Sequence, residues 1–200
     1  IWKGLVGSEM CIRDSDKIIK MELQKTNLDG CFLIKKAIFN DHRGFFTETY
    51  NKKDFDEVLV TDINFVQDNL SMSLKGVVRG LHYQVNNPQG KLVRVVKGSV
   101  FDVAVDLRKN SNTFGKWYGT ELNDKNMHQL WIPEGFAHGF MVLSEMAYFE
   151  YKCTSFYTPG DEGVIHWKDP DLAIEWPSLK EIVISEKDDS AESFKSFIER

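Results

Sequence analysis

The sequence predicts an all-β sandwich or barrel, in one domain, with a few short helices at its periphery. Short strand-like segments separated by turns recur about every 8–12 residues, as they do in sandwiches and barrels. Helical periodicity is scarce in the same region. No internal repeat, low-complexity tract or linker divides the chain. Its 200 residues, 42% of them hydrophobic, are enough for one sizeable core.

Two pairs of strands are predicted to form hairpins. Residues 91–96 and 99–107 are rich in Val and flank Lys97-Gly98, which is a turn signal. Residues 139–143 and 147–153 form a similar pair around Ser144-Glu145. Further strands are expected over residues 117–122, 129–132 and 164–167.

Helix is predicted in two places. Residues 52–59 have the length of one or two turns. Near the C-terminus, a capping-box-like pair, Asp189 and Glu192, precedes apolar residues at helical spacing: Phe194, Phe197 and Ile198. This pattern predicts a terminal amphipathic helix that packs on the barrel and has a structural role.

The first twenty residues differ from the rest of the chain. They begin without Met, and residues 5–14 (LVGSEMCIRD) are similar to translated adapter sequence. They also lack the apolar core and cleavage site of a signal peptide. We therefore expect residues 1–20 to be a non-native extension, Met21 to be the natural start, and residues 21–200 to be the folded domain.

The composition excludes several classes of function. A net charge of −5 argues against non-specific nucleic-acid binding, which needs a basic surface. No apolar run approaches the roughly 18–20 residues of a membrane span. An odd number of cysteines without a CxxC pair indicates free thiols in a reducing cytoplasm: Cys11, Cys31 and Cys153. We expect a cytoplasmic protein with neither a nucleic-acid nor a membrane partner.

A metal site is not expected. A metal ion normally needs three or more convergent neutral or anionic ligands. The five histidines form no His-x-His pair, and none lies at short ligand spacing from a carboxylate. His82, the best candidate, is flanked by Arg79 and Lys91, and these cations would repel a metal ion.

The segment from Arg79 to Lys91 is the strongest candidate for chemistry. It places a guanidinium, an imidazole and an ammonium group within thirteen residues, which suits a base that acts on an anionic substrate. A regular strand would point Arg79 and His82 to opposite faces, but a bulge at Gly80 brings both to one face. The alternative is that His82 is a core histidine with a structural partner.

Polar residues elsewhere add to this constellation. Gln67 and Asn69 alternate on one face of a predicted strand. One pocket holding Arg43, Arg79 and Lys91 would suit phosphate groups, because guanidinium and ammonium groups match their oxygens. The alternative is a scatter of solvated surface charges.

Two tyrosines are further candidates. Phe149, Tyr151 and Cys153 share one face of a strand, and an inward Tyr151 hydroxyl can donate a proton opposite a histidine base. Tyr157 precedes the turn Thr158-Pro159-Gly160, where its ring can stack on a base or a sugar. The alternative for both tyrosines is ordinary packing.

Seven sequence blocks in order resemble the dTDP-4-dehydrorhamnose 3,5-epimerase family, which belongs to the cupin-like jelly-roll superfamily. The resemblance runs from about Met21 to Asp188. The blocks are RGFF at 43–46 with Glu48, FVQDN at 65–69, VRGLHYQ at 78–84, QGKLVR at 89–94, FDVAVD at 101–106, WIPEGFAHGF at 131–140 and SEKD at 185–188. The resemblance implies a cupin-like jelly roll.

The resemblance also implies catalytic roles. His82 resembles the base that removes protons at C3 and C5 of a 4-keto sugar, and Asp188 resembles the carboxylate that orients it. Tyr151 resembles the acid that returns a proton from the opposite face. Lys91 resembles the cation near the enolate oxyanion. Neither a metal nor a redox cofactor is implied.

A larger set matches substrate-binding positions of the family: Arg43, Glu48, Gln67, Asn69, Arg79, His138, Glu162 and Lys187. Tyr157 resembles the residue that stacks on thymine. The family also implies a homodimer with N-terminal strand exchange, in which Arg43 and Glu48 serve the partner's pocket. The expected substrate is a dTDP-4-keto-6-deoxy sugar.

The implied function is synthesis of the L-rhamnose precursor of a surface polysaccharide such as an O-antigen. The nearest alternative is a mono-epimerase that inverts only C3 or C5 of a related sugar, because such enzymes share His82 and Tyr151. A metal-dependent cupin oxygenase would have the same fold. A catalytically dead sugar-binding cupin is the third alternative, and retention of the four catalytic residues argues against it.

Overall fold

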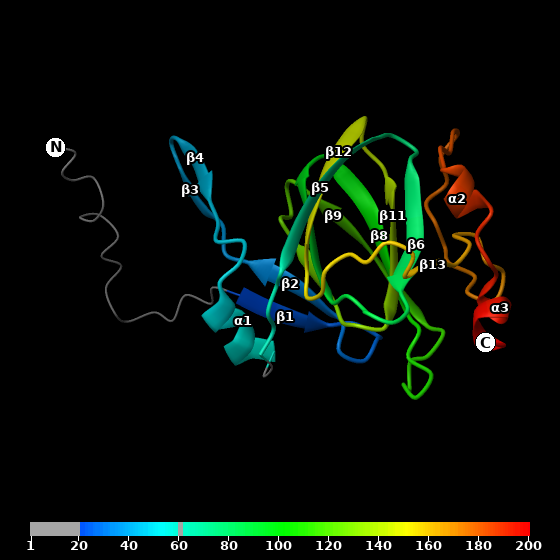
Figure 1. The fold of residues 1–200 in the computed structure, drawn as a ribbon. Helices are drawn as coiled ribbons and strands as arrows, with labels where there is room; N and C mark the ends of the chain where they lie inside the picture. Colours follow the sequence, from blue (N-terminus) through cyan, green and yellow to red (C-terminus); the bar gives the residue numbers. More distant parts are fainter. Residues whose placement is uncertain (1–20, 60–61) are drawn as a thin grey trace.

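The computed structural model describes residues 21–59 and 62–200. Residues 1–20, predicted to be a non-native extension, lie outside the described residues. Within the described ranges, two antiparallel sheets face each other, and one small hairpin and three short helices lie around them (Figure 1). This architecture confirms the predicted all-β sandwich with short peripheral helices.

The larger sheet has six strands, in the order β1 (Met21–Lys25), β2 (Phe32–Lys36), β10 (Gln129–Ile132), β7 (Lys91–Lys97), β12 (Met146–Cys153) and β5 (Gln67–Leu74). The smaller sheet has five, in the order β13 (Glu162–Val164), β6 (Val78–Gln84), β11 (Phe136–Val142), β8 (Ser99–Asp106) and β9 (Trp117–Asn123). Strands β3 (Phe39–Asp41) and β4 (Gly44–Phe46) form a separate hairpin that projects away from both sheets (Figure 1).

The main core lies between the two sheets. Val93 and Phe149 of the larger sheet pack with Ala104 and Phe140 of the smaller one. The Phe140 and Phe149 rings are stacked with their centroids 4.3 Å apart. Because side chains alternate along a strand, a polar residue two positions from one of these core residues also faces the space between the sheets.

The outer faces of both sheets are also covered. Helix α1 (Lys52–Leu59) places Phe55 against Leu92 and Trp131 of the larger sheet. Helix α3 (Phe194–Ile198) packs on the outer face of the smaller sheet, and helix α2 (Glu186–Asp189) lies beside β6 (Figure 1). Only short helices are needed because the sheets already form the main core.

Both predicted hairpins are wrong. Strand β7 pairs with β10 and β12, whereas β8 pairs with β9 and β11, so Lys97-Gly98 carries the chain from one sheet to the other. Strands β11 and β12 are likewise in different sheets. A tight turn between two apolar strands has the same sequence pattern at a hairpin and at a corner between sheets. Only the packing of the sheets distinguishes them.

Most strand positions agree with the sequence prediction. The strand over residues 129–132 and the helix over residues 52–59 are confirmed with the predicted bounds. The strand predicted over residues 164–167 is displaced: β13 covers Glu162–Val164, and Ile165 forms an isolated bridge with Glu192.

The C-terminal helix is confirmed, but its predicted cap is wrong. The N-cap of α3 is Ser193, whose side chain accepts a hydrogen bond from the Ser196 backbone N–H. Glu192 precedes the helix and accepts a hydrogen bond from the Tyr83 hydroxyl instead. Phe194 is buried as predicted, whereas Ile198 is exposed because the helix ends at the surface.

Two further predictions concern the described residues. Cys31 and Cys153 are both free and buried, as expected. No helix in the described part of the chain is long and apolar enough to cross a membrane.

Candidate active site

A bulge in β6 brings Arg79 and His82 to the inner face of the smaller sheet. His82 lies opposite His138 and Arg79 opposite Phe140, so two residues of β6 face one residue of β11. Gly80 has a φ of 116°, and a Cβ there would lie 2.6 Å from the Gly139 Cα. The bulge therefore requires glycine at this position, and the predicted bulge at Gly80 is confirmed.

His82 and Asp188 form a hydrogen-bonded pair. The His82 Nε2 and Asp188 Oδ1 atoms are 2.7 Å apart, and the second carboxylate oxygen accepts a hydrogen bond from the Gly80 backbone N–H at 3.1 Å. Burial alone would raise the pKa of Asp188, but the bonds from His82 and Gly80 hold it below its usual value. An ionised Asp188 requires a proton on Nε2, which leaves Nδ1 of His82 as the basic nitrogen.

Helix α2 holds Asp188 in place for this contact. Ser185 is the N-cap of α2, and its side chain accepts a hydrogen bond from the Asp188 backbone N–H at 3.1 Å. The Asp188 side chain is buried, whereas the His82 side chain is about one third exposed. The imidazole is therefore bonded to a fixed carboxylate and is still partly accessible to solvent.

A second histidine–carboxylate pair lies beside the first. His138 Nε2 and Asp102 Oδ2 are 2.8 Å apart, and both side chains are buried. Burial lowers the pKa of His138, while Asp102 opposes this shift. Within the described residues, Asp102 Oδ1 has no hydrogen-bond partner. Asp102 was not predicted to be a site residue. The sequence feature that could have indicated it is the position of an acidic residue inside an apolar strand.

Lys91 and Tyr151 come from the facing sheet. Lys91 lies opposite Cys153 in the register of β7 and β12, and Tyr151, two residues before Cys153, shares its inward face. Burial raises the pKa of Tyr151, so its phenol stays protonated at neutral pH. Burial lowers the pKa of Lys91, and the nearby acidic groups of Cys153 and Asp102 oppose this shift. The predicted face of Tyr151 and Cys153 is confirmed.

Two amide side chains extend this face along β5. Gln67 Nε2 donates to Asn69 Oδ1 at 3.0 Å, and Asn69 Nδ2 donates to Cys153 Sγ at 3.6 Å. The prediction that Gln67 and Asn69 share one face is confirmed.

Arg79 is oriented by a serine that the sequence analysis missed. Arg79 Nε donates to Ser73 Oγ at 3.0 Å, and Ser73 is buried. The guanidinium charge lies close enough to Tyr151 to influence its pKa. Because a serine in a strand is common, no sequence signal distinguished Ser73.

An ion pair lies close to His82. Lys187 Nζ donates to Glu162 Oε2. Burial would raise the pKa of Glu162, but Lys187, His82 and Tyr157 lower it. Tyr157 is about half exposed. Glu162 lies close enough to His82 for the two charges to interact. A substrate-binding role for Glu162, Lys187 and Tyr157 stays a prediction.

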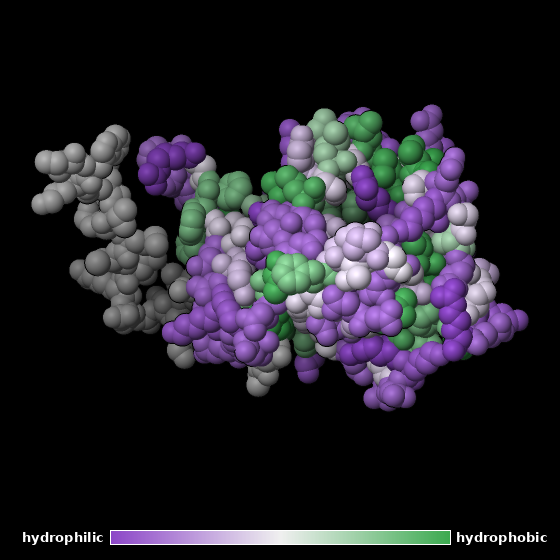
Figure 2. Space-filling view, in the orientation of Figure 1, coloured by the Kyte–Doolittle hydropathy of each residue, from purple (hydrophilic) through white to green (hydrophobic). Residues whose placement is uncertain are grey.

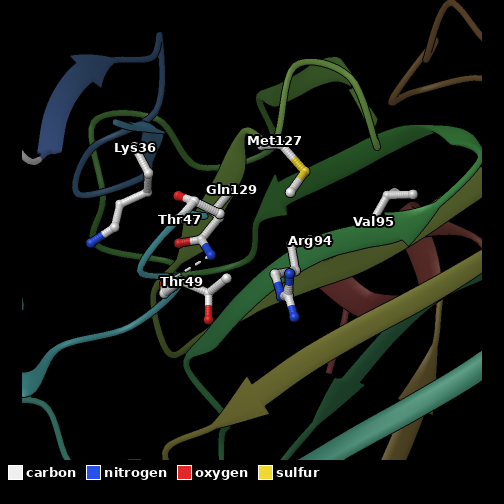
Figure 3. A pocket seen from close by; sticks show the side chains of 7 residues that line it. All are labelled: Lys36, Thr47, Thr49, Arg94, Val95, Met127 and Gln129. Atoms are coloured by element: carbon white, nitrogen blue, oxygen red, sulfur yellow. Dashed lines mark hydrogen bonds between the residues drawn. The ribbon is translucent and has the colours of Figure 1, made fainter. Parts of the chain in front are cut away.

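Arg43 and Glu48 lie apart from these residues within one chain. Arg43 lies in the projecting β3–β4 hairpin, pairs with Asp41 at 2.6 Å and has a largely exposed guanidinium. Residue 48 lies between Thr47 and Thr49, which line a small pocket with Arg94 and Gln129 (Figure 3). Glu48 Oε2 accepts a hydrogen bond from Asn51 Nδ2 at 3.4 Å.

This small pocket is on the outer face of the larger sheet. Arg94 and Gln129 are opposite each other in the register, and alternation places them on the face opposite to Val93 and Leu130 of the main core. Gln129 Nε2 donates to the Thr49 carbonyl at 2.9 Å (Figure 3). Within one chain, Arg43 lies in the projecting hairpin with an exposed side chain, so a pocket that it shares with Arg79 and Lys91 stays a prediction for a dimer.

No group of three or more His, Cys, Asp or Glu residues in the described ranges is arranged to hold a metal ion. The smaller sheet carries the His82 imidazole, which is bonded to the Asp188 carboxylate of α2, and the larger sheet carries the Tyr151 phenol and the Lys91 amine. Proton transfer at a carbon atom next to a carbonyl group needs these components.

Comparisons with known proteins agree with this chemistry. The family model of dTDP-4-dehydrorhamnose 3,5-epimerase matches residues 25–196. The dTDP-4-dehydrorhamnose 3,5-epimerase of Methanothermobacter thermautotrophicus is 52% identical over 166 residues, which are 82% of this chain and 89% of the relative.

Solved structures and a mono-epimerase relative extend the comparison. The dTDP-6-deoxy-D-glucose-3,5-epimerase of Legionella pneumophila, in complex with dTDP-4-keto-L-rhamnose, has a TM-score of 0.86 and 51% identity and covers 88% of this chain and 93% of its own. The dTDP-4-dehydrorhamnose 3-epimerase of Streptomyces niveus is 40% identical over 159 residues, which are 79% of this chain and 77% of the relative.

Proposed function

Because this chain belongs to the dTDP-4-dehydrorhamnose 3,5-epimerase family, we propose that it converts dTDP-4-dehydro-6-deoxy-D-glucose to dTDP-4-dehydro-L-rhamnose. The reaction inverts C3 and C5 of the sugar and is an isomerisation. The observation that supports it best is that His82, bonded to Asp188 of α2, lies on one sheet, whereas Tyr151 and Lys91 lie on the other. The product would supply L-rhamnose for a surface polysaccharide.

His82 is the base in this proposal. Hydrogens at C3 and C5 are acidic because the C4 ketone lies between them, so removal of either one gives an enolate. Asp188 keeps His82 in one tautomer and stabilises the imidazolium that forms. Lys91 stabilises the enolate oxygen, and its burial increases the strength of this interaction.

Tyr151 is the proton donor. A sugar ring between the sheets would have His82 on one side and Tyr151 on the other, because β6 and β12 belong to opposite sheets. A proton removed from one face and returned to the other inverts the carbon. The raised pKa of Tyr151 keeps its proton available at neutral pH.

The remaining residues bind the substrate. Arg79, Lys187 and His138 suit the pyrophosphate and sugar oxygens, because they are cationic or hydrogen-bonding groups beside the cavity. The other proposed contacts are Gln67, Asn69, Glu162 and Tyr157, of which Tyr157 stacks on thymine.

We propose that a homodimer completes the site with Arg43 and Glu48 of the second copy. The β3–β4 hairpin projects away from both sheets (Figure 1). It exposes the apolar rings of Phe39, Phe45 and Phe46. Strand β5 also exposes an apolar row: Leu70, Met72 and Leu74. Figure 2 shows hydrophobic surface over the upper end of the sandwich, where β5 and β12 lie. A cytoplasmic location is proposed from the two buried free thiols.

The decisive experiment is incubation with dTDP-4-keto-6-deoxyglucose in deuterated water containing EDTA, followed by NMR. Deuterium at C3 and C5 with inversion at both carbons is expected. Exchange at one carbon alone would instead favour a mono-epimerase, the second candidate, because one relative is a 3-epimerase. Activity that EDTA abolishes would support a metal-dependent cupin, and no exchange at all would contradict epimerase activity on this substrate.

A further inference from the structure

The loop between β12 and β13 displays two aromatic side chains. Phe156 and Tyr157 are 63% and 47% exposed. Exposed rings at a loop tip are normally mobile, because few contacts restrain the backbone that carries them. Here the backbone on both sides of Tyr157 is bonded to buried side chains of the sandwich.

Gln84 makes the central contacts with this loop. Its Oε1 atom accepts a hydrogen bond from the Thr158 backbone N–H at 2.8 Å, and its Nε2 atom donates to the Phe156 carbonyl at 3.2 Å. The same nitrogen donates to the Asn87 carbonyl at 2.6 Å. Gln84 is buried. Its hydrogen bonds hold Phe156, the residue before Tyr157, and Thr158, the residue after it.

Gln84 is on the same strand and face as the proposed base. His82 and Gln84 are two residues apart in β6, and they lie opposite Val164 and Glu162 of β13 in regular register. One strand therefore sets the position of His82 relative to Tyr157.

Other side chains add contacts around this anchor. Gln67 Oε1 accepts a hydrogen bond from the Tyr157 backbone N–H at 2.9 Å, and Gln89 Nε2 donates to the Ser155 carbonyl at 2.8 Å. Asp161 accepts hydrogen bonds from the backbone N–H groups of Asn86 and Asn87, both at 2.9 Å. The loop is thus fixed before any ligand binds.

We propose that Gln84 is a positioning residue for nucleoside recognition, because it holds Tyr157 as a preformed platform for a planar base. This inference rests on the proposed function, in which Tyr157 stacks on thymine. A preformed loop binds more tightly because less conformational entropy is lost on binding. The side-chain amide of Gln84 bonds to backbone atoms of Asn87, Phe156 and Thr158, so we expect it to contribute to affinity and not to proton transfer.

The test compares Gln84→Leu with the wild-type full-length protein. Gln84→Leu removes all three hydrogen bonds at nearly constant volume. We expect the Kd for dTDP and the KM for the sugar nucleotide to rise about tenfold, with kcat within about threefold of wild type. The Kd for inorganic pyrophosphate should stay within about twofold, because this probe lacks the base.

A second readout follows the loop itself. Hydrogen exchange at the Tyr157 and Thr158 amides should be faster in Gln84→Leu, and dTDP should protect them less than in wild type. Gln84→Glu keeps the acceptor for Thr158 but places an oxygen against two carbonyls, so we expect the same direction of change. Asn27→Leu is the matched control. It removes a hydrogen bond from the Asn27 side-chain amide to the Trp117 carbonyl, outside the site, and should leave the Kd, KM, kcat and exchange rates unchanged.

The outcomes separate this inference from the proposed function. Unchanged dTDP affinity in both Gln84 variants would overturn the inference while wild-type epimerase activity stood. Equal weakening of dTDP and pyrophosphate would also overturn it, because the effect would then not concern the base. A wild-type protein that neither binds dTDP nor epimerises the sugar would overturn the proposed function and the inference together.

Discussion

His82 and His138 lie opposite each other on β6 and β11, and each is bonded to a carboxylate, but their surroundings differ. The His82 side chain is about one third exposed, whereas that of His138 is almost fully buried. Burial lowers the pKa of His138 and favours its neutral form. We infer that His82 exchanges protons with the substrate and that His138 acts as a neutral hydrogen-bonding group.

At the residue scale, Tyr151→Phe separates proton removal from proton return. The variant keeps His82 and Lys91 but lacks the donor, so we expect product formation to fall about 10²–10⁴-fold. Wash-in of deuterium from solvent without inversion should fall much less. NMR in deuterated water measures both, and a fully active Tyr151→Phe enzyme would disprove the assignment of Tyr151.

Asp106 provides a pH-dependent test of stability. It is fully buried, and its carboxylate accepts hydrogen bonds from the side chains of Arg108, Ser111 and Thr113. Burial would raise its pKa, but these donors lower it to about 2. Its stabilisation is therefore fully present above the unfolded pKa and is lost as pH falls toward 2.

We expect Asp106→Asn to be less stable than wild type by a margin that depends on pH. The difference in the free energy of unfolding should narrow by about 1 kcal/mol between pH 6 and pH 3. Urea unfolding at several pH values measures it. A difference that stays constant over this range would mean that Asp106 has no lowered pKa.

At the element scale, the bulge of β6 decides which face carries the chemistry. Val78 and Leu81 pack in the outer clusters of the smaller sheet, and Arg79 and His82 face inward. A regular strand would direct either Arg79 or His82 away from the cavity, because successive side chains alternate. Gly80 is therefore as necessary to the site as the residues that contact substrate.

Gly80→Ala should lose both stability and activity. A Cβ at Gly80 would press against the backbone of His138 and Gly139, and the φ of 116° disfavours any L side chain. We expect a loss of about 2–4 kcal/mol in urea unfolding. Gly160→Ala is the matched control: its φ is 85°, but nothing lies within 4 Å of the added atom, so it should lose only about 1 kcal/mol. Equal losses would show that the contact with β11 is unimportant.

At the scale of the whole molecule, Arg43 gives a direct test of the proposed dimer. If each site combines His82 of one chain with Arg43 of the other, His82→Ala and Arg43→Ala dimers are both impaired, but a mixed dimer has one intact site. After unfolding and refolding an equimolar mixture, we expect about one quarter of wild-type activity by random pairing.

A second mixture controls for this result. His82 and Tyr151 belong to the same chain's cavity, so mixing His82→Ala with Tyr151→Phe should restore no activity. Light scattering should show a mass of two chains. Recovery in neither mixture, or a monomeric mass, would contradict a shared site.

Much of the site could be predicted from local sequence. The grouping of Arg79, His82 and Lys91 follows from their short separation and from the glycine that permits a bulge. The shared face of Gln67 and Asn69 follows from alternation alone. Resemblance was needed for Asp188, because it lies 106 residues from His82 and no local pattern joins a strand to a distant short helix.

The sequence by itself determined most of the strands from residue 91 onward and the shared polar face of Gln67 and Asn69, because alternation and turn residues act over a few positions. The tertiary structure alone decided that β7 and β8 lie in different sheets, that Asp102 and Ser73 bind His138 and Arg79, and that Arg43 lies away from its own chain's cavity. These facts depend on how two sheets pack and on contacts between segments distant in the sequence. The free energy of packing is a property of the whole molecule, so no short segment encodes it.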